Sequence, residues 1–174
     1  MAKRSLPSVE YLRQRLSYDP GTGDLTWNEI EGDAAFNSQW AGKPALNGIS
    51  CYGYKTGAVA GTPLKAHRVA WAITYGIWTE HDIDHINGIR GDNRICNLRE
   101  ATKAQNAMNR SLARGKSQYK GVYSSGYGGW CANVQKDGRR HYLGTFSTEV
   151  EAANAYNAAA KANFGAYARL NAIS

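Results

Sequence analysis

The apolar positions near the start of the chain recur with helical spacing and predict a short helix over residues 8–17, which Ser8 is suited to cap. Turn-forming residues at 19–24 separate this helix from a predicted short strand at 25–27. Residues 28–62 are rich in glycine and aromatic residues and show no clean period, so we expect short strands and loops there. The apolar residues that share one face of this helix are Val9, Leu12 and Leu16.

A second helical pattern covers residues 65–75, with Gly76 at the position of a C-cap. His67 near its start is either a candidate ligand or a histidine that packs or caps at the helix start, and the pattern favours the second interpretation. After it, Asn87-Gly88 is a strong turn signal, and Thr102 with Gln105 three residues later forms a capping box. This segment is therefore predicted to run strand, loop, short strand, helix.

The last third of the chain contains three strand patterns followed by one helix. Asp137-Gly138 predicts a tight hairpin turn between the second and third strands. Thr148 and Glu151 form a capping box for the helix, which Gly165 ends, and its alanines allow it to lie close to the sheet. The three strands are predicted at residues 119–123, 130–135 and 139–144.

These elements predict an α+β protein made of two small domains. The length of 174 residues allows one domain of ordinary size or two small ones. Residues 111–118 are small, polar and basic, which is typical of a linker. We therefore expect a domain at 1–110, with its central motif at 67–110, a linker at 111–118 and a second domain at 119–171.

The net charge of +7 suggests a polyanionic partner, and most of the excess lies in the last third. Residues 111–174 carry eight basic and three acidic side chains. No run of 18 apolar residues is present, which excludes a membrane-spanning helix, and the basic N-terminus lacks the apolar segment of a secretory signal. We expect a monomer in the cytoplasm of a bacterial or phage-infected cell.

The three cysteines argue against a cysteine-bound zinc site. Cys51, Cys96 and Cys131 are far apart and form no Cys-x-x-Cys pair. Their odd number fits reduced thiols inside a cell.

Residues 83–106 contain the strongest candidate for chemistry. Asp84-His85 ends the first predicted strand, and Asn106 lies in the first turns of the helix that could face it. A carboxylate and an amide oxygen suit Mg²⁺, which retains water and takes phosphate oxygens as further ligands. A neutral imidazole beside the metal can take a proton from water. Together such groups can activate a nucleophile and stabilise charge on a phosphate.

Residues 67–110 resemble the HNH nucleases, in particular the phage and intron-encoded homing endonucleases. The resemblance rests on Asp84-His85, the Asn-Gly loop, Asn97-Leu98-Arg99 and Asn106, where many members have histidine and asparagine is an accepted variant. It implies a ββα-metal fold with one Mg²⁺ or Mn²⁺ per active site and no zinc. The catalytic residues implied are His85 as general base, Asp84 and Asn106 as metal ligands, and Asn97 as a brace for the loop and the histidine. Asn87 and Asn93 are interpreted as structural.

Residues 119–171 resemble the AP2 DNA-binding domain, through Tyr119-Lys120-Gly121-Val122, Tyr142-Leu143-Gly144-Thr145-Phe146 and the alanine-rich helix. The family lays its three-stranded sheet in the major groove of double-stranded DNA, where all four base pairs can be distinguished. Several of its DNA-contacting arginines are replaced here, so its base preference does not transfer. Packing is the alternative role for Trp130 and Tyr142. The DNA-facing positions implied are Lys120, Tyr123, Trp130, Asn133, Gln135, Arg140 and Tyr142.

The two resemblances together predict a metal-dependent endonuclease that hydrolyses a phosphodiester bond with His-activated water and is targeted by its AP2-like module. Two alternatives remain open. The first is a nonspecific HNH nuclease with the same active site. The second is a sequence-specific DNA-binding regulator whose HNH unit is inert.

Overall fold

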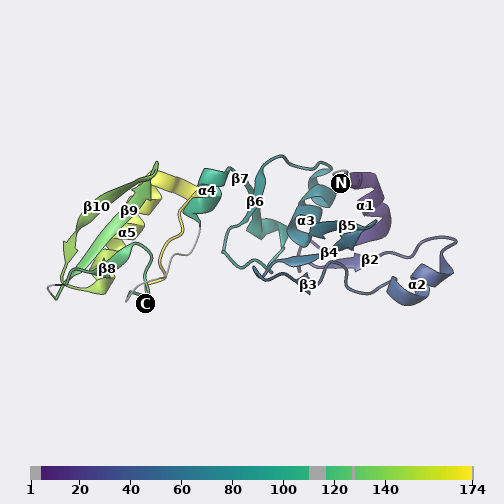
Figure 1. Ribbon diagram of the computed structural model, residues 1–174, viewed down its shortest axis with the longest axis horizontal. Helices are drawn as coiled ribbons and strands as arrows, with labels where there is room; N and C mark the ends of the chain where they lie inside the picture. The colour runs from purple at the N-terminus through teal and green to yellow at the C-terminus, as the bar shows by residue number, and fades with distance from the viewer. Residues whose placement is uncertain (1–4, 110–116, 127, 174) are drawn as a thin grey trace. The chain divides into compact units, whose positions relative to one another are not determined.

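The computed structural model of the protein describes residues 5–109, 117–126 and 128–173, and its contacts divide the chain into two compact units, Met1–Thr102 and Lys103–Ser174 (Figure 1). Each unit combines helices with small antiparallel sheets, so the predicted α+β class is confirmed. None of the helices in these described ranges is long and apolar enough to cross a membrane.

The division between the units falls earlier than the domain boundary predicted at residue 110. Helix α4 (Lys103–Met108) has its contacts in the second unit, where it touches the short 3-10 helix η2 (Gly165–Tyr167). Residues 111–116 of the predicted linker lie outside the described residues. The domain limits drawn from the sequence therefore stay a prediction.

The first unit opens with helix α1 (Val9–Arg15), and the side chain of Ser8 accepts a backbone N–H of its first turn. The chain continues directly into strand β1 (Leu16–Tyr18), which pairs antiparallel with β2 (Leu25–Trp27). The predicted helix and strand are both confirmed. The helix ends earlier than predicted because Leu16 is extended and joins the sheet.

The region from residue 28 to residue 62 holds one helix in addition to the predicted strands. Helix α2 (Ala34–Trp40) begins after Asp33, whose carboxylate accepts the N–H of Phe36 at 3.0 Å. It buries none of its residues, which explains why the sequence shows no apolar period there. The three-stranded antiparallel sheet of this region consists of β3 (Gly48–Ile49), β4 (Lys55–Val59) and β5 (Thr62–Lys65), in that order.

Helix α3 (Ala66–Tyr75) contributes residues to two hydrophobic clusters of the first unit. One of its faces joins the core made with α1, β4 and β5. Ala70 instead packs with Ile83 and Leu98, which belong to the strands described next. Gly76 ends the helix with a φ of 78°, in the left-handed region that favours glycine, as predicted.

Strands β6 (Asp82–His85) and β7 (Leu98–Ala101) form an antiparallel pair. A loop connects them and ends in the 3-10 helix η1 (Ile95–Asn97), and α4 follows β7. The predicted order of strand, loop, short strand and helix is therefore confirmed.

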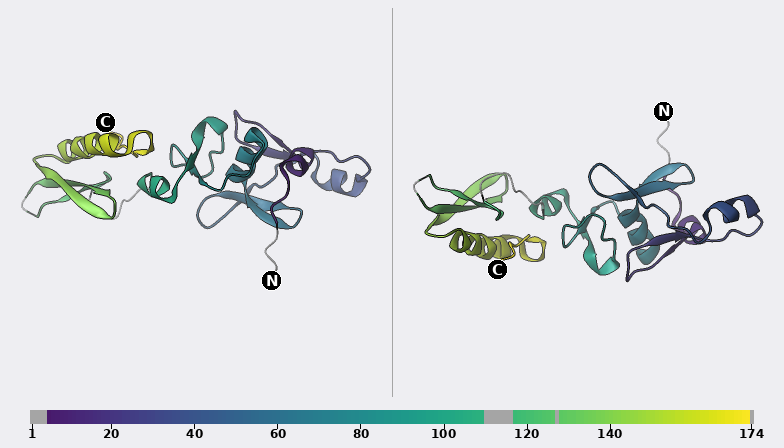
Figure 2. Two further views of the ribbon diagram at one scale, coloured as in Figure 1. Left: turned by 90° about the horizontal axis from the view of Figure 1, so that it is seen from above. Right: turned by 90° about the horizontal axis from the view of Figure 1, so that it is seen from below.

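The second unit contains a three-stranded antiparallel sheet in the order β10-β9-β8, with helix α5 (Glu149–Phe164) along one face (Figure 2). The hairpin between β9 and β10 turns at Asp137 and Gly138, with φ values of 51° and 75°, as a tight turn of this kind requires. The predicted sheet with one packed helix is confirmed. Its strands are β8 (Val122–Ser124), β9 (Trp130–Lys136) and β10 (Arg139–Phe146).

The close contact between α5 and the sheet depends on small residues. The predicted capping box of Thr148 and Glu151 starts the helix, and Ala152, among other alanines, is fully buried against the sheet. Gly121 has a φ of 75°, and a Cβ at this position would collide with the ring of Tyr156. A larger residue here would therefore force the helix and the sheet apart.

Candidate functional site

The end of β6 places Asp84 and His85 next to each other in a buried position. The two residues are 5 % and 4 % exposed. The register of the hairpin sets Asp84 opposite Arg99, which donates hydrogen bonds from Nε at 2.9 Å and from Nη2 at 2.7 Å to Oδ2 of the carboxylate. This ion pair compensates the buried charge of Asp84 and fixes the orientation of its carboxylate.

The ring of His85 is held by groups from three other segments. Its Nε2 lies 3.0 Å from Oδ1 of Asn93, which is 1 % exposed. The rings of His67 and Tyr54 pack against it, with centroids 5.0 and 5.9 Å from that of His85. We call His67, His85 and Tyr54 the histidine cluster.

The surroundings of His85 keep it in its neutral form. Burial lowers the pKa of His85 below its usual value of 6.5, and the hydrogen bond with Asn93 and the charge of Asp84 offset part of this shift. Burial, followed by the charges of His85 and Lys65, also lowers the pKa of His67 to about 3. At neutral pH both rings are therefore uncharged, and His85 is in the form that can accept a proton.

Asn97 lies within the loop that follows His85. Its Oδ1 accepts the N–H of Asn87 at 3.0 Å, and its Nδ2 donates to Oδ1 of Asn87 at 3.0 Å and to the carbonyl of Asp92 at 2.8 Å. These bonds hold the two ends of the loop together. Asn97 thus contacts the loop around the histidine, and its bracing role stays a prediction.

The fourth predicted residue, Asn106, is half-buried on α4. Because α4 belongs to the second unit, the relation of Asn106 to Asp84 and His85 stays a prediction.

The chemistry of Asp84 and Asn106 fits a hard divalent cation. Asp84 offers a buried, oriented carboxylate and Asn106 an amide oxygen. In the part of the chain that the structure describes, no group of three or more His, Cys, Asp or Glu could hold a metal ion. Mg²⁺ does not need such a group, because it often takes one or two protein ligands together with water and phosphate oxygens.

Two residues around the site had no role assigned from the sequence. Asn93, which the sequence predicts to be structural, contacts the ring of His85. Arg99, which belongs to the Asn97-Leu98-Arg99 motif, pairs with Asp84. The contact of Arg99 with Asp84 is predictable from the pairing of β6 with β7, which sets the two residues opposite each other. The contact of Asn93 with His85 depends on the path of the loop.

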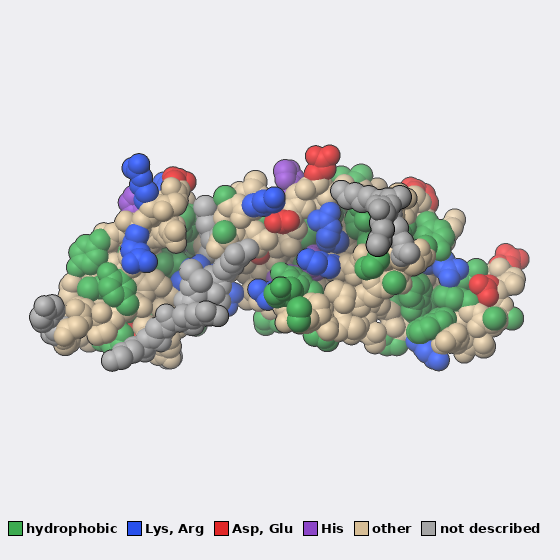
Figure 3. Space-filling model, in the orientation of Figure 1, with side chains coloured by type: hydrophobic (Ala, Val, Ile, Leu, Met, Phe, Trp, Pro, Cys, Tyr) green, Lys and Arg blue, Asp and Glu red, His purple; other side chains and the backbone are tan. Residues whose placement is uncertain are grey.

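In the second unit, five of the seven predicted DNA-facing residues lie on the sheet face opposite α5. The side chains of Ala132 and Val134 on β9 pack toward the helix, so the alternate residues of β9 and their cross-strand partners point to the other face. At the left of Figure 3, over the second unit, basic side chains (blue) lie beside apolar ones (green). The five residues are Tyr123, Asn133, Gln135, Arg140 and Tyr142.

The other two predicted DNA-facing residues are placed differently. Trp130 is half-buried and packs against the core between the sheet and α5, because it shares the face of Ala132. For Trp130 the structure therefore favours the packing alternative over DNA contact. Lys120 precedes β8 and is half-buried, and burial followed by the charge of Arg169 lowers its pKa to about 8. The backbone of Lys120 is held by hydrogen bonds with the side chain of Asn171.

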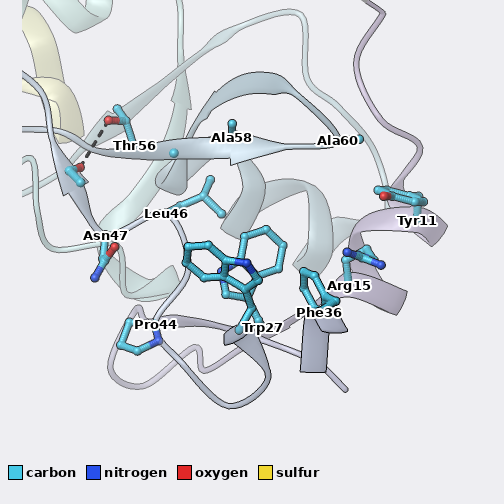
Figure 4. A pocket seen from close by; sticks show the side chains of 13 residues that line it. Tyr11, Arg15, Trp27, Phe36, Pro44, Leu46, Asn47, Thr56, Ala58 and Ala60 are labelled. Carbon is cyan, nitrogen blue, oxygen red and sulfur yellow. Dashed lines mark hydrogen bonds between the residues drawn. The ribbon is translucent and has the colours of Figure 1, made fainter. Parts of the chain in front are cut away.

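A cavity of about 570 Å³ lies elsewhere in the first unit (Figure 4). Trp27 and Phe36 line it, and the guanidinium of Arg15 stacks on the Phe36 ring with its Cζ 4.1 Å from the ring centroid. None of its lining residues belongs to the histidine cluster, so the cavity takes no part in the chemistry described above.

Comparison with known proteins identifies the segment that carries Asp84 and His85. The family model of the HNH endonucleases matches residues 64–108. An uncharacterized HNH endonuclease of Acanthamoeba polyphaga mimivirus is 37 % identical over 91 residues, which are 52 % of this chain and 47 % of the relative. The chain therefore spans about half the length of this viral relative.

Plant proteins match a different region of the chain. Dehydration-responsive element-binding protein 2C of Arabidopsis thaliana is 48 % identical over 59 residues, 33 % of this chain and 17 % of the relative. Protein 2A of that name from Oryza sativa subsp. japonica is 46 % identical over 55 residues, 30 % of this chain and 20 % of the relative. The chain therefore matches the HNH endonuclease family over residues 64–108 and is similar to AP2-like plant proteins over another region.

Proposed function

We propose that the protein is a metal-dependent DNA endonuclease of the HNH homing type, which its AP2-like module directs to double-stranded DNA. The observation that carries the proposal is the buried pair at the end of β6. Asp84 is oriented by Arg99, and the neutral His85 is held by Asn93 beside it. If Asp84 and His85 were exposed surface residues without a chemical role, they would need neither Arg99 nor Asn93 as a partner.

In the proposed reaction, His85 accepts a proton from a water molecule as the oxygen of that water attacks the phosphorus. A new P–O bond forms while the bond to the leaving sugar oxygen breaks. Asp84 and Asn106 would hold one Mg²⁺ or Mn²⁺, which stabilises negative charge on the phosphate and the leaving oxygen. Arg99 keeps the carboxylate in place, and Asn97 keeps the loop closed around the histidine.

The open sheet of the second unit is the proposed DNA-contacting surface. Arg140 and Gln135 are cross-strand partners on this face, and both are exposed. Tyr142 on the same face is 61 % exposed. Arginine and amide side chains are the groups that recognise base edges in the major groove, and arginine also binds phosphate.

Incubation with supercoiled plasmid and Mg²⁺ or Mn²⁺ tests the proposal. We expect nicked or linear product in the presence of metal, loss of cleavage with a chelator, and loss of cleavage in the His85→Ala variant. Mapping the product ends on target and scrambled DNA distinguishes a selective enzyme from a nonspecific nuclease. Tight DNA binding without cleavage at any metal concentration would contradict the proposal and favour a DNA-binding regulator.

A further inference from the structure

We propose that Asn93 is a positioning residue for His85, and that it keeps the hydrogen of the neutral ring on Nε2 so that Nδ1 is the proton-accepting atom. The catalytic consequence rests on the proposed nuclease function, whereas the effect on the ring does not. The amide oxygen Oδ1 of Asn93 carries no hydrogen, so in their 3.0 Å contact Nε2 must be the donor. The lone pair of the neutral imidazole is then on Nδ1.

The N-terminal hairpin holds the backbone of Asn93 in place. The hydroxyl of Tyr18 on β1 donates to the carbonyl of Asn93 at 2.7 Å. Gly23, in the turn between β1 and β2, lies so close that a Cβ there would be 2.5 Å from the carbonyl carbon of Asn93. The N–H of Ile95 donates to the carbonyl of Pro20 in the same turn at 3.2 Å. Residues 18–23 thus support the loop that carries Asn93.

Two aromatic rings also pack against the ring of His85. The His67 ring meets it edge-on, with an interplanar angle of 77°, and Tyr54 contacts both histidine rings. Packing by rings restricts rotation but does not select which nitrogen carries the hydrogen. That selection requires a hydrogen-bond partner of one type, which Asn93 provides.

The stability of the fold alone does not account for Asn93. Its Nδ2 is buried and has no hydrogen-bond partner among the described residues. A buried donor without a partner destabilises a protein, and a leucine of similar volume would avoid this loss. A residue that lowers stability at a site next to a catalytic group is expected when it serves the chemistry.

The test compares Asn93→Leu, which removes the acceptor, with Asn93→Asp, which restores an acceptor oxygen. The matched control is Asn37→Leu, which removes an amide that bonds to the backbone of Ile30 in the same unit. For each variant we would measure kcat and KM for plasmid cleavage. The ring tautomer of His85 would be measured by ¹⁵N NMR in the DNA-free protein, at a pH where the ring is neutral.

We expect the Nε2–H tautomer in the wild type and a mixture of tautomers in Asn93→Leu. We also expect kcat to fall by roughly 10–100-fold in Asn93→Leu with little change in KM, as for other partners that orient a catalytic histidine. Asn93→Asp should recover most of both effects, and Asn37→Leu should show neither.

An Nδ1–H tautomer in the wild type, or an unchanged tautomer in Asn93→Leu, would overturn the inference. A wild type that binds DNA but never cleaves it would instead overturn the proposed function, and the NMR measurement would still decide the role of Asn93 toward the ring.

Discussion

The two units place their candidate functional residues in opposite environments. In the first unit, Asp84, His85 and Asn93 are buried and bonded to neighbours. In the second unit, Arg140 and Tyr142 are exposed on an open sheet. A proton transfer depends on groups that are held in a fixed geometry, whereas reading a DNA groove requires donors that reach beyond the protein surface.

The two units also differ in net charge. Residues 1–102 carry eleven basic and eleven acidic side chains and have no net charge, whereas residues 103–174 carry ten basic and three acidic side chains. The whole net charge of +7 therefore belongs to the second unit. We expect that unit to supply most of the salt-dependent affinity for DNA.

The largest expected effect concerns the buried site. His85→Ala should lower kcat for cleavage by about 10²–10⁴-fold, because it removes general-base assistance. DNA affinity should change little, because His85 is 4 % exposed and far in sequence from the open sheet. Single-turnover cleavage and a separate binding titration check the two expectations. Cleavage by His85→Ala at the wild-type rate would show that another group is the base.

The next effect concerns the metal requirement. Asp84→Asn and Asn106→Ala should each raise the Mg²⁺ concentration needed for half-maximal cleavage, by roughly 10–100-fold, because each weakens a proposed ligand. Asp24→Ala removes an exposed carboxylate paired with Lys55 and is the matched control. Titrations of cleavage with Mg²⁺ measure the shift. An unchanged Mg²⁺ requirement in both site variants would refute this assignment of ligands.

A smaller effect is expected on the open sheet. Arg140→Ala should weaken binding to target DNA by about 1–3 kcal/mol if the guanidinium contacts a guanine with two donors. Lys161→Ala removes the same charge from α5, on the other side of the sheet, and should change affinity less. Binding titrations at two salt concentrations compare the variants. Equal losses in both would mean that charge alone, not the sheet face, carries the affinity.

The smallest effect is on stability in mild acid. The pKa of His67 is about 3 in the folded protein and near 6.5 when unfolded, so the unfolded chain binds a proton first as the pH falls. Stability is therefore full above pH 6.5 and declines below it, by about 1.4 kcal/mol at pH 5.5. Urea unfolding followed by tryptophan fluorescence measures this, since four of the five tryptophans lie in the first unit.

Two histidine variants sharpen that measurement. His67→Gln should reduce the dependence of stability on pH and leave the part that is due to His85, whose pKa burial also lowers. His141→Gln, at an exposed position of the second unit, is the matched control. A His67→Gln variant with the wild-type pH dependence would assign the effect to another group.

Elements with strong local signals were predictable from the sequence. The Ser8 cap, the Gly76 C-cap, the Asp137-Gly138 turn and the Thr148 capping box each depend on neighbouring residues alone, and all are confirmed. Helix α2 is not predictable in this way, because it has an N-cap but buries none of its residues and so leaves no apolar period. In the candidate site, the pair Asp84-His85 is predictable because the two residues are adjacent in a recognisable motif.

The resemblance to two families, the α+β class and the residue types from which a metal site and a proton acceptor can be built follow from the sequence. The groups that orient those residues become visible only in the folded chain. Tyr18 reaches Asn93 across 75 positions of the chain, and Arg99 reaches Asp84 across 15. The packing of Trp130 against the core between the sheet and α5 likewise follows from the folded chain. Such contacts depend on loop paths and strand faces, which many residues set together, whereas caps and turns are set by the few residues within them.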